Sequence, residues 1–335
     1  MPLTFRTLPL TPAQTRAARR TNAVMAIAPR LKLGGWRLQL GVRLNPIAAR
    51  AAGRLSAASL KRRGVTVSST SIGPATQPIP LRILEPSTPP HALIVDLHGG
   101  GWVIGSAALN DPLTGHFAEA GLAVASVDYR LLDEVRQVWM PDAVEDCVTA
   151  LRWALNEGRA RFGVDDVFLI GESAGAHLAA LALLKLRDEG ATHLPACIFV
   201  QGVFDLSGTP SVRAAGPEAL LFDGPNLTRD LGLLTPGLDE AGRRQPELSP
   251  LYADLRGLPP ALFVMGEADP LRDDSILMAE AWGRHNTAVL LDVPTAPHGF
   301  QHFGAPTAAL AQAVIRDWIF ENADGVRVSV DNPNR

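Results

Sequence analysis

Cysteine is scarce in this sequence: Cys147 and Cys197 are the only two among 335 residues. Two cysteines in a chain of this length do not form a disulfide framework. Both lie in apolar stretches typical of helices or strands, so we expect buried thiols. A small scaffold held together by disulfides is therefore excluded.

Long hydrophobic runs and a recognisable signal peptide are also missing. The first residues, MPLTFRTLPLTPAQ, do not show a basic stretch followed by a long apolar one. The apolar stretch AVMAIAP is too short to cross a bilayer. An Arg-rich, acid-free start also resembles a mitochondrial transit peptide, but this basic region is long and Arg predominates over Lys throughout. We therefore expect a cytoplasmic protein without stable membrane association.

Acidic residues are absent from residues 1–63, where every charged side chain is Arg or Lys. The rest of the chain is acidic, and the net charge is -3. This balance gives no reason to expect a nucleic-acid partner. Hydrophobic residues make up 47% of the chain, which is enough for a large core.

Strands and helices are expected to alternate over most of the chain. The stretches ALIVDLH, DVFLIG, ACIFVQGVF and ALFVMG are nearly continuous apolar runs, typical of strands buried on both faces. Helices are expected between them, over about 112–120, 141–161, 173–189 and 274–285, with a last one near the C-terminus. Such alternation predicts an α/β fold with a mostly parallel central sheet flanked by helices.

Two segments interrupt the alternation and predict a helical cap. Residues 1–63 are expected to form cap helices, the first starting at Thr11-Pro12. Residues 206–245 are rich in Gly, Pro, Leu and Asp and contain no strand pattern, so we expect an inserted cap segment at the sheet edge where α/β ligand sites lie. The core then comprises residues 64–205 and 246–322, followed by a polar tail over 323–335.

The sequence Gly171-Glu172-Ser173-Ala174-Gly175 lies between an apolar strand and an apolar helix. This context is what the G-x-S-x-G motif of serine hydrolases requires. Small flanking residues permit a tight strand-to-helix turn that exposes the Ser173 hydroxyl. We therefore predict that Ser173 is a catalytic nucleophile, although a Gly-rich turn with an incidental serine is the alternative reading.

A glycine-rich loop, HGGGW, follows the strand ALIVDL. Unshielded N–H groups in such a loop can stabilise the oxyanion of a tetrahedral intermediate, together with the N–H of the residue after the nucleophile, here Ala174. A phosphate-binding loop is the rival reading, but neither G-x-G-x-x-G nor GK[ST] is present. We expect His98 to orient the loop and Trp102 to contact substrate.

Asp269 is the predicted carboxylate partner of the catalytic histidine. It lies in ALFVMGEADPLRDD, directly after an apolar strand. Glu267, Asp273 and Asp274 are nearby competitors. The Asp-Pro pair fixes a turn at the strand exit, whereas the two later aspartates resemble charges at a helix N-terminus.

His298 is the predicted general base, in a His-Gly pair between the last strand and the last helix. His302 is the competing histidine. The two together could suggest a metal pair, but no third ligand or HExxH pattern accompanies them, so no metal is expected. The chain order of Ser173, Asp269 and His298 is that of α/β-hydrolase triads.

The motifs HGGGW, DYRL, GESAG, DPLRDD and HGF, in this order, resemble the hormone-sensitive-lipase-like family of bacterial esterases. The resemblance extends from about Ala92 to the last helix. It implies the α/β-hydrolase fold with a helical cap, an ester substrate and no cofactor. The roles that it implies are a catalytic triad and oxyanion N–H donors: Ser173, Asp269 and His298 for the former, Gly100, Gly101 and Ala174 for the latter.

The sequence departs from that family in two places. Glu172 stands where the family usually has Asp, and the stretch LDEVRQVWMP after DYRL is longer than usual. GESAGAHLA with the glycine loop is also similar to the kynurenine formamidases. We therefore expect a serine carboxylesterase, with an amidase or arylformamidase as the alternative and an inactive ligand-binding receptor as a more distant one.

The basic N-terminal helices carry many apolar residues between the arginines, including Val24, Leu31 and Leu40. Apolar residues at this density need a partner surface. A membrane, a second subunit in a homodimer, and the chain's own active-site mouth are the three candidates. We favour the active-site mouth, where these helices would limit substrates to short and medium acyl groups.

Overall fold

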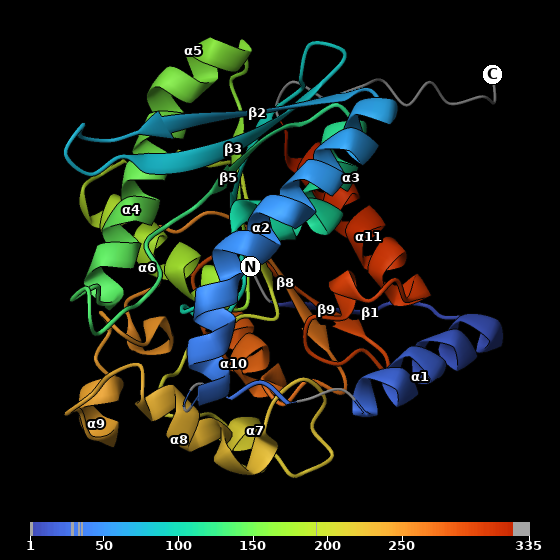
Figure 1. Ribbon diagram of the computed structural model, residues 1–335, viewed down its shortest axis with the longest axis vertical. Helices are drawn as coiled ribbons and strands as arrows, with labels where there is room; N and C mark the ends of the chain where they lie inside the picture. Colours follow the sequence, from blue (N-terminus) through green and yellow to red (C-terminus); the bar gives the residue numbers. More distant parts are fainter. Residues whose placement is uncertain (1–2, 28–29, 33, 35, 192, 324–335) are drawn as a thin grey trace.

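The computed structural model describes residues 3–27, 30–32, 34, 36–191 and 193–323, and these contain a nine-stranded sheet (Figure 1). The strand order is β1-β9-β8-β7-β6-β4-β5-β3-β2. β3 pairs antiparallel with β2 and with β5, and the other pairs are parallel. The predicted mostly parallel sheet is confirmed. The strands are β1 (Thr4–Thr7), β2 (Val65–Ile72), β3 (Ile79–Pro86), β4 (Leu93–Leu97), β5 (Ala123–Val127), β6 (Val167–Glu172), β7 (Cys197–Val200), β8 (Ala261–Gly266) and β9 (Ala288–Val293).

Helices cover both faces of this sheet. Side chains of α4, α6 and α10 pack on one face, and those of α3, α11 and the end of α2 pack on the other. A π-helical turn at Ala154–Gly158 joins α4 to α5, so the helix expected over 141–161 is continuous. The helices are α1 (Pro12–Ala26), α2 (Trp36–Arg62), α3 (Asp111–Glu119), α4 (Met140–Trp153), α5 (Arg159–Phe162), α6 (Ala174–Asp188), α7 (Pro210–Arg213), α8 (Leu227–Gly232), α9 (Glu240–Arg243), α10 (Arg272–Gly283) and α11 (Pro306–Asn322).

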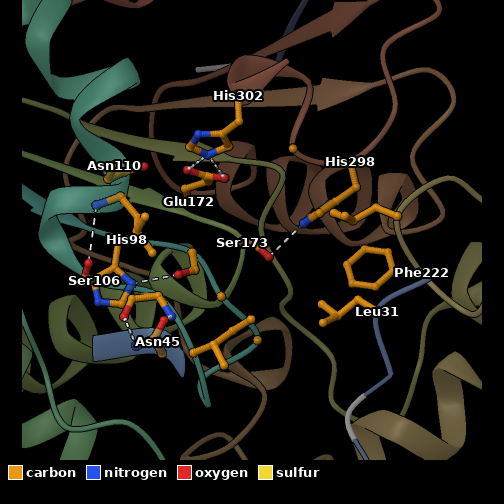
Figure 2. A pocket seen from close by; sticks show the side chains of 18 of the residues that line it. Leu31, Asn45, His98, Ser106, Asn110, Glu172, Ser173, Phe222, His298 and His302 are labelled. Atoms are coloured by element: carbon orange, nitrogen blue, oxygen red, sulfur yellow. Dashed lines mark hydrogen bonds and ion pairs between the residues drawn. The ribbon is translucent and has the colours of Figure 1, made fainter. Parts of the chain in front are cut away.

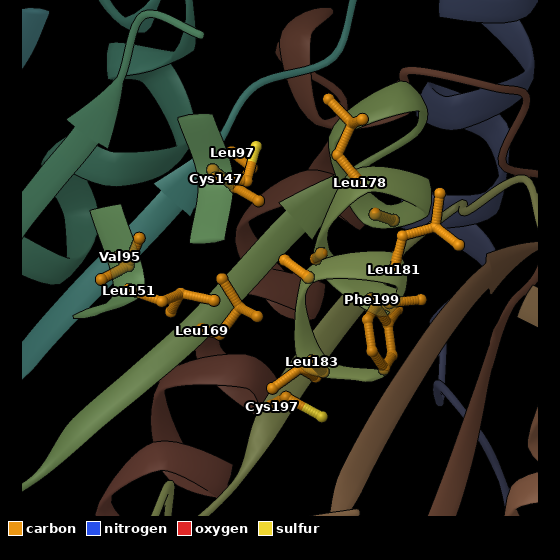
Figure 3. Packing of buried hydrophobic residues seen from close by; sticks show 14 of the residues in the cluster. Val95, Leu97, Cys147, Leu151, Leu169, Leu178, Leu181, Leu183, Cys197 and Phe199 are labelled. Carbon is orange, nitrogen blue, oxygen red and sulfur yellow. The ribbon is translucent and has the colours of Figure 1, made fainter. Parts of the chain in front are cut away.

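The apolar runs of the central strands are buried on both faces, as their composition predicts. Along β4, Leu93 and Val95 pack with α4 and α6, whereas Ile94 between them packs with the opposite layer. Figure 3 shows the face covered by α4 and α6, where both cysteines are also buried among apolar side chains. Cys147 and Cys197 are free thiols, which confirms that prediction. The core thus holds the carboxyl ends of β4 and β6 in fixed positions.

The N-terminal segment corrects one expectation, because residues 1–63 do not consist of helices alone. Thr4–Thr7 forms the edge strand β1, which pairs with β9 in parallel. All four of its residues are exposed, so the strand has no buried face and leaves no hydrophobic alternation in the sequence. α1 follows with the expected Thr11 cap, and it packs against α11.

Two segments distant in the sequence meet beside the sheet edge. The chain between α1 and α2 forms a short parallel bridge with the insertion between β7 and β8, at Leu31 and Phe222. In Figure 1, α7, α8 and α9 of that insertion lie near the start of α2. Residues 324–335 of the predicted tail lie outside the described residues. No helix in the described ranges is long and apolar enough to cross a membrane.

Candidate active site

Ser173 lies at a sharp turn between β6 and α6. Its φ and ψ are 53° and -116°, a conformation that is strained for any residue other than glycine. A Cβ at Gly175 would overlap the carbonyl oxygen of Leu97, and one at Gly171 would press against the backbone of Gly175 and Ala176. Glycine is therefore required on both sides of the serine. The turn places the Ser173 hydroxyl at the sheet edge.

Three side chains that the sequence placed after separate strands form one hydrogen-bonded series. His298 Nε2 lies 2.9 Å from Ser173 Oγ, and His298 Nδ1 lies 2.9 Å from Asp269 Oδ2 (Figure 2 shows the first pair). All three residues are buried. Asp269 Oδ1 also accepts a hydrogen bond from the Leu271 N–H at 2.8 Å. The carboxylate, the imidazole and the hydroxyl are thereby aligned.

The competing carboxylates are engaged elsewhere. Glu267 accepts a hydrogen bond from the Thr295 N–H, and Asp273 accepts one from the Ser211 N–H. Asp274 is fully buried and accepts from the N–H groups of Phe204 and Asp205 and from the Thr209 hydroxyl. Burial raises the pKa of Asp274 to about 7. Among these acidic residues, only Asp269 contacts His298.

The glycine loop runs along the same cavity. Gly100 and Gly101 have φ values of 132° and 59°, and a Cβ at Gly100 would overlap the Ile104 carbonyl oxygen. Within the described residues, no backbone acceptor takes a hydrogen bond from the N–H groups of Gly100, Gly101 or Ala174. Three N–H groups on the loop and turn that flank Ser173 thus have no backbone partner among the described residues. This is the arrangement that oxyanion stabilisation needs.

His98 and Asn45 hold this loop. The His98 Nδ1–H donates to the Gly99 carbonyl at 2.7 Å, and the ring stacks on Tyr129 with centroids 4.3 Å apart. Burial lowers the pKa of His98. Asn45, on α2, exchanges two hydrogen bonds with the backbone of Gly105, at 2.8 and 3.0 Å. His98 therefore orients the loop, as predicted, and the N-terminal region contributes a second support that the sequence did not reveal.

The prediction that Trp102 contacts substrate is wrong, because its side chain does not line the cavity. The indole is 2% exposed, and its Nε1–H donates to His177 Nδ1 at 3.2 Å. Burial lowers the pKa of His177 to about 4, which keeps that ring neutral and able to accept. Trp102 has a φ of 64°. With that backbone the large apolar ring packs into the core instead of contacting a substrate.

The cavity above Ser173 has a volume of about 390 Å³ and two unlike walls (Figure 2). One wall, the core wall, carries the polar residues His98, Asn110, Glu172 and His302, with Ile104, Leu109 and Phe303 beside them. The other, the cap wall, is apolar and comes from the two segments joined by the bridge: Leu31, Leu221 and Phe222. The Phe222 ring lies against the His298 ring, with centroids 4.7 Å apart.

Glu172 and His302 form an ion pair in the core wall. His302 Nε2 lies 2.8 and 2.9 Å from the two carboxylate oxygens of Glu172. The charge of Glu172 raises the pKa of His302. Burial acts to raise the pKa of Glu172, but the neighbouring histidines, His302 foremost, hold it below its usual value. His302 is therefore not an alternative base for Ser173. In the sequence, only its closeness to His298 indicated that it lies near the site.

Two further polar residues near the site were not singled out from the sequence. Asp96 is fully buried on β4 and accepts a hydrogen bond from Asn110 at 2.7 Å. Its burial raises the pKa of the carboxyl to about 7. Gln201 follows β7 and donates to Asp269 Oδ2 at 2.7 Å. Neither residue belongs to a recognisable motif.

Within the described residues, no cluster of three or more His, Cys, Asp or Glu side chains could hold a metal ion.

Comparisons with known proteins agree with the fold. A family described as alpha/beta hydrolase fold matches residues 94–302. The carboxylesterase NlhH of Mycobacterium tuberculosis is 34% identical over 254 residues, which cover 71% of this chain and 76% of that protein. The ethyl acetate hydrolase of Pseudomonas putida is 31% identical over 238 residues, 68% of this chain and 73% of that one. The solved structure of the esterase LipW from Mycobacterium marinum superposes with a TM-score of 0.78 at 25% identity, covering 95% and 96% of the two chains.

The matched region contains the turn at Ser173, the glycine loop and the loop of His298, all of which line the cavity. The chain therefore belongs to the alpha/beta hydrolase fold family. Within that family it belongs to the hormone-sensitive-lipase-like group of bacterial esterases, so it is a carboxylic-ester hydrolase.

Proposed function

We propose that this esterase acts through an acyl-enzyme formed on Ser173. His298 Nε2 takes the hydroxyl proton as Ser173 Oγ attacks the ester carbonyl carbon. The tetrahedral oxyanion is stabilised by the N–H groups of Gly100, Gly101 and Ala174. His298 then donates the proton to the departing alkoxide, and the alcohol leaves. Water, deprotonated by His298, releases the carboxylic acid and restores Ser173.

Asp269 has an electrostatic role in this scheme. Its Oδ2 accepts from His298 Nδ1, which leaves Nε2 as the basic nitrogen facing Ser173. The carboxylate also stabilises the imidazolium that forms while the proton is held. The observation that supports the whole proposal is this aligned series of three side chains, ending beside three unoccupied N–H donors.

The nucleophile is tested with Ser173→Ala, and Ser106→Ala is the matched control because Ser106 lines the same cavity without contacting His298. We expect Ser173→Ala to lower kcat on p-nitrophenyl butyrate at least about 10³-fold. It should also abolish the mass increase that a fluorophosphonate causes. Ser106→Ala should retain labelling and most of the activity. If the kcat of Ser173→Ala stayed within roughly tenfold of the parent value, Ser173 would not be the nucleophile.

We also propose that the two bridged segments form a cap that restricts the acyl chain to short and medium lengths. The support is the cap wall, where Leu31, Leu221 and Phe222 close the cavity beside His298. The Leu31 N–H donates to the Leu221 carbonyl, and the Asp223 N–H donates to the Leu31 carbonyl. A p-nitrophenyl series from acetate to palmitate tests this range. A maximum at palmitate would overturn it.

A further inference from the structure

Gln201 lies where three loops around the proposed active site meet. It directly follows β7, is 1% exposed, and its N–H donates to the Val264 carbonyl at 2.7 Å. Its φ is 50°, in the left-handed region that favours glycine. A buried non-glycine residue keeps this conformation only where its surroundings hold it there.

The Gln201 amide holds two loops at once. Its Nε2 donates to Asp269 Oδ2 at 2.7 Å and to the Pro297 carbonyl at 2.9 Å. Its Oε1 accepts from the Gly299 N–H at 2.7 Å. One side chain therefore fixes the backbone on both sides of His298 and the carboxylate that His298 contacts.

The chemistry of these contacts requires an amide. The Asp269 oxygen that accepts from Gln201 is the same oxygen that accepts from His298 Nδ1, so that oxygen needs donors only. The backbone on either side of His298 needs one donor and one acceptor. A carboxylate has no hydrogen to donate, and a hydrocarbon side chain has neither function. Gln supplies both from one planar group.

We propose that Gln201 is a positioning residue for the esterase reaction. It holds Asp269 and residues 297–299 so that the His298 ring keeps both its bond to Asp269 and its direction toward Ser173. The inference rests on the proposed function of these three side chains. Gln201 acts through Asp269 and the histidine loop, without touching Ser173 or substrate.

A double-mutant cycle between Gln201→Met and Asp269→Asn tests whether Gln201 acts through Asp269. In the parent, Gln201→Met should lower kcat by about 10- to 100-fold, since small misplacements of catalytic groups have effects of this size. KM should change by less than about threefold, because the substrate contacts remain. In the Asp269→Asn background the same substitution should lower kcat by less than about threefold.

Gln312→Met is the matched control for the cycle. Gln312 is a buried glutamine on α11 that makes one hydrogen bond, to the Pro112 carbonyl at 3.3 Å. It should lower the melting temperature with little change in kcat. Equal effects of Gln201→Met in both backgrounds would overturn the proposal. If Asp269→Asn itself left kcat near the parent value, the triad assignment would be the part that failed.

Gln201→Glu provides a second test if Gln201→Met does not fold. The titratable groups near this position are Asp269, which Gln201 contacts, and His298, which contacts Asp269. Glu172 interacts with His298 through its charge, and the exposed Glu267 follows Gly266. A protonated carboxyl keeps a donor for Asp269, whereas the ionised form loses it and repels the carboxylate. The kcat of Gln201→Glu divided by the parent kcat should therefore be roughly tenfold lower, or more, at about pH 9 than at about pH 5. A constant ratio, with both proteins folded throughout, would overturn the proposal.

Discussion

The two walls of the cavity are built by different forces. The core wall and the Asp269–His298 pair behind it are held by hydrogen bonds and ion pairs between side chains, on a backbone that is locally strained at Ser173 and Gln201. The cap wall is held by apolar contact, one short bridge and an exposed ion pair between Lys32 and Asp223. A substitution in the core wall should change the chemistry, and one in the cap wall should change which esters fit.

This difference follows from what each wall must do. Groups that move protons have to be kept within hydrogen-bonding distance, which buried polar networks achieve. A wall that selects by size needs only volume, and apolar side chains supply volume without directional bonds. The comparison predicts that the two kinds of effect can be separated by mutation.

Asp269→Asn should have the largest effect, because Asp269 contacts His298 behind the cavity and is not part of the cap wall. The asparagine would present a neutral amide to His298, so kcat should fall by about 10³- to 10⁴-fold. The acyl-length profile of the residual activity should keep its shape. Asp273→Asn is the control, because Asp273 is the second residue of α10 and its carboxylate accepts from the Ser211 N–H. It should retain kcat within about threefold. A large loss in the control alone would mean that the wrong carboxylate was chosen.

Glu172→Gln should reduce stability in a pH-dependent manner, because it removes the charge partner of His302. The charge of Glu172 raises the pKa of His302 above its ordinary value of 6.5. The stability that His302 contributes is therefore complete below pH 6.5 and is lost as pH rises through the raised pKa. The pKa of Glu172 is lowered, so its contribution is complete above 4.5 and is lost as pH falls further. The loss in unfolding free energy should be about 1–3 kcal/mol.

Thermal melting across pH checks this prediction. The difference in melting temperature between parent and Glu172→Gln should be largest between about pH 5 and pH 6 and smaller at about pH 9. Glu189→Gln is the control, since Glu189 pairs with Arg152, which stays charged over this range. A Glu172→Gln difference that does not vary with pH would contradict the ion pair as the cause.

Phe222→Ala should change substrate length and spare the chemistry. Removing the ring enlarges the cavity beside His298. Each additional buried methylene of the acyl chain is worth about 0.8 kcal/mol, so kcat/KM for decanoate relative to butyrate should rise by about tenfold or more. Leu238→Ala is the control, because Leu238 lies on the same insertion but is exposed outside the cavity. An unchanged length profile in Phe222→Ala would remove the cap wall from substrate selection.

Lys32→Ala should have the smallest effect. Lys32 Nζ lies 2.7 Å from Asp223 Oδ2, but the Lys32 side chain is 50% exposed. Exposed pairs contribute about 0.2–1 kcal/mol, so urea unfolding should show a loss within that range, and added salt should reduce it. A loss well above this range would show that the two cap segments depend on each other more strongly than the apolar contacts suggest.

The local patterns in the sequence were sufficient for the fold class and for the three side chains that align. Glycines at 171 and 175 permit the turn, and Asp269 and His298 each lie in the loop that follows a buried strand. Since parallel strands end at the same sheet edge, residues after different strands come together. The edge strand β1 was missed because all four of its residues are exposed and show no alternation.

By itself, the sequence determined which strands are buried, where the nucleophile turn lies and which loops carry charged partners, because these depend on residues close together in the chain. Tertiary structure alone decided that Trp102 turns into the core, that Glu172 pairs with His302, that Gln201 joins the loops of Asp269 and His298 and that Leu31 meets Phe222. Each of these contacts joins residues from separate elements, and no local pattern specifies such a pairing. Burial then gives these contacts their strength, because a polar group removed from water must find a partner in whatever element lies nearest.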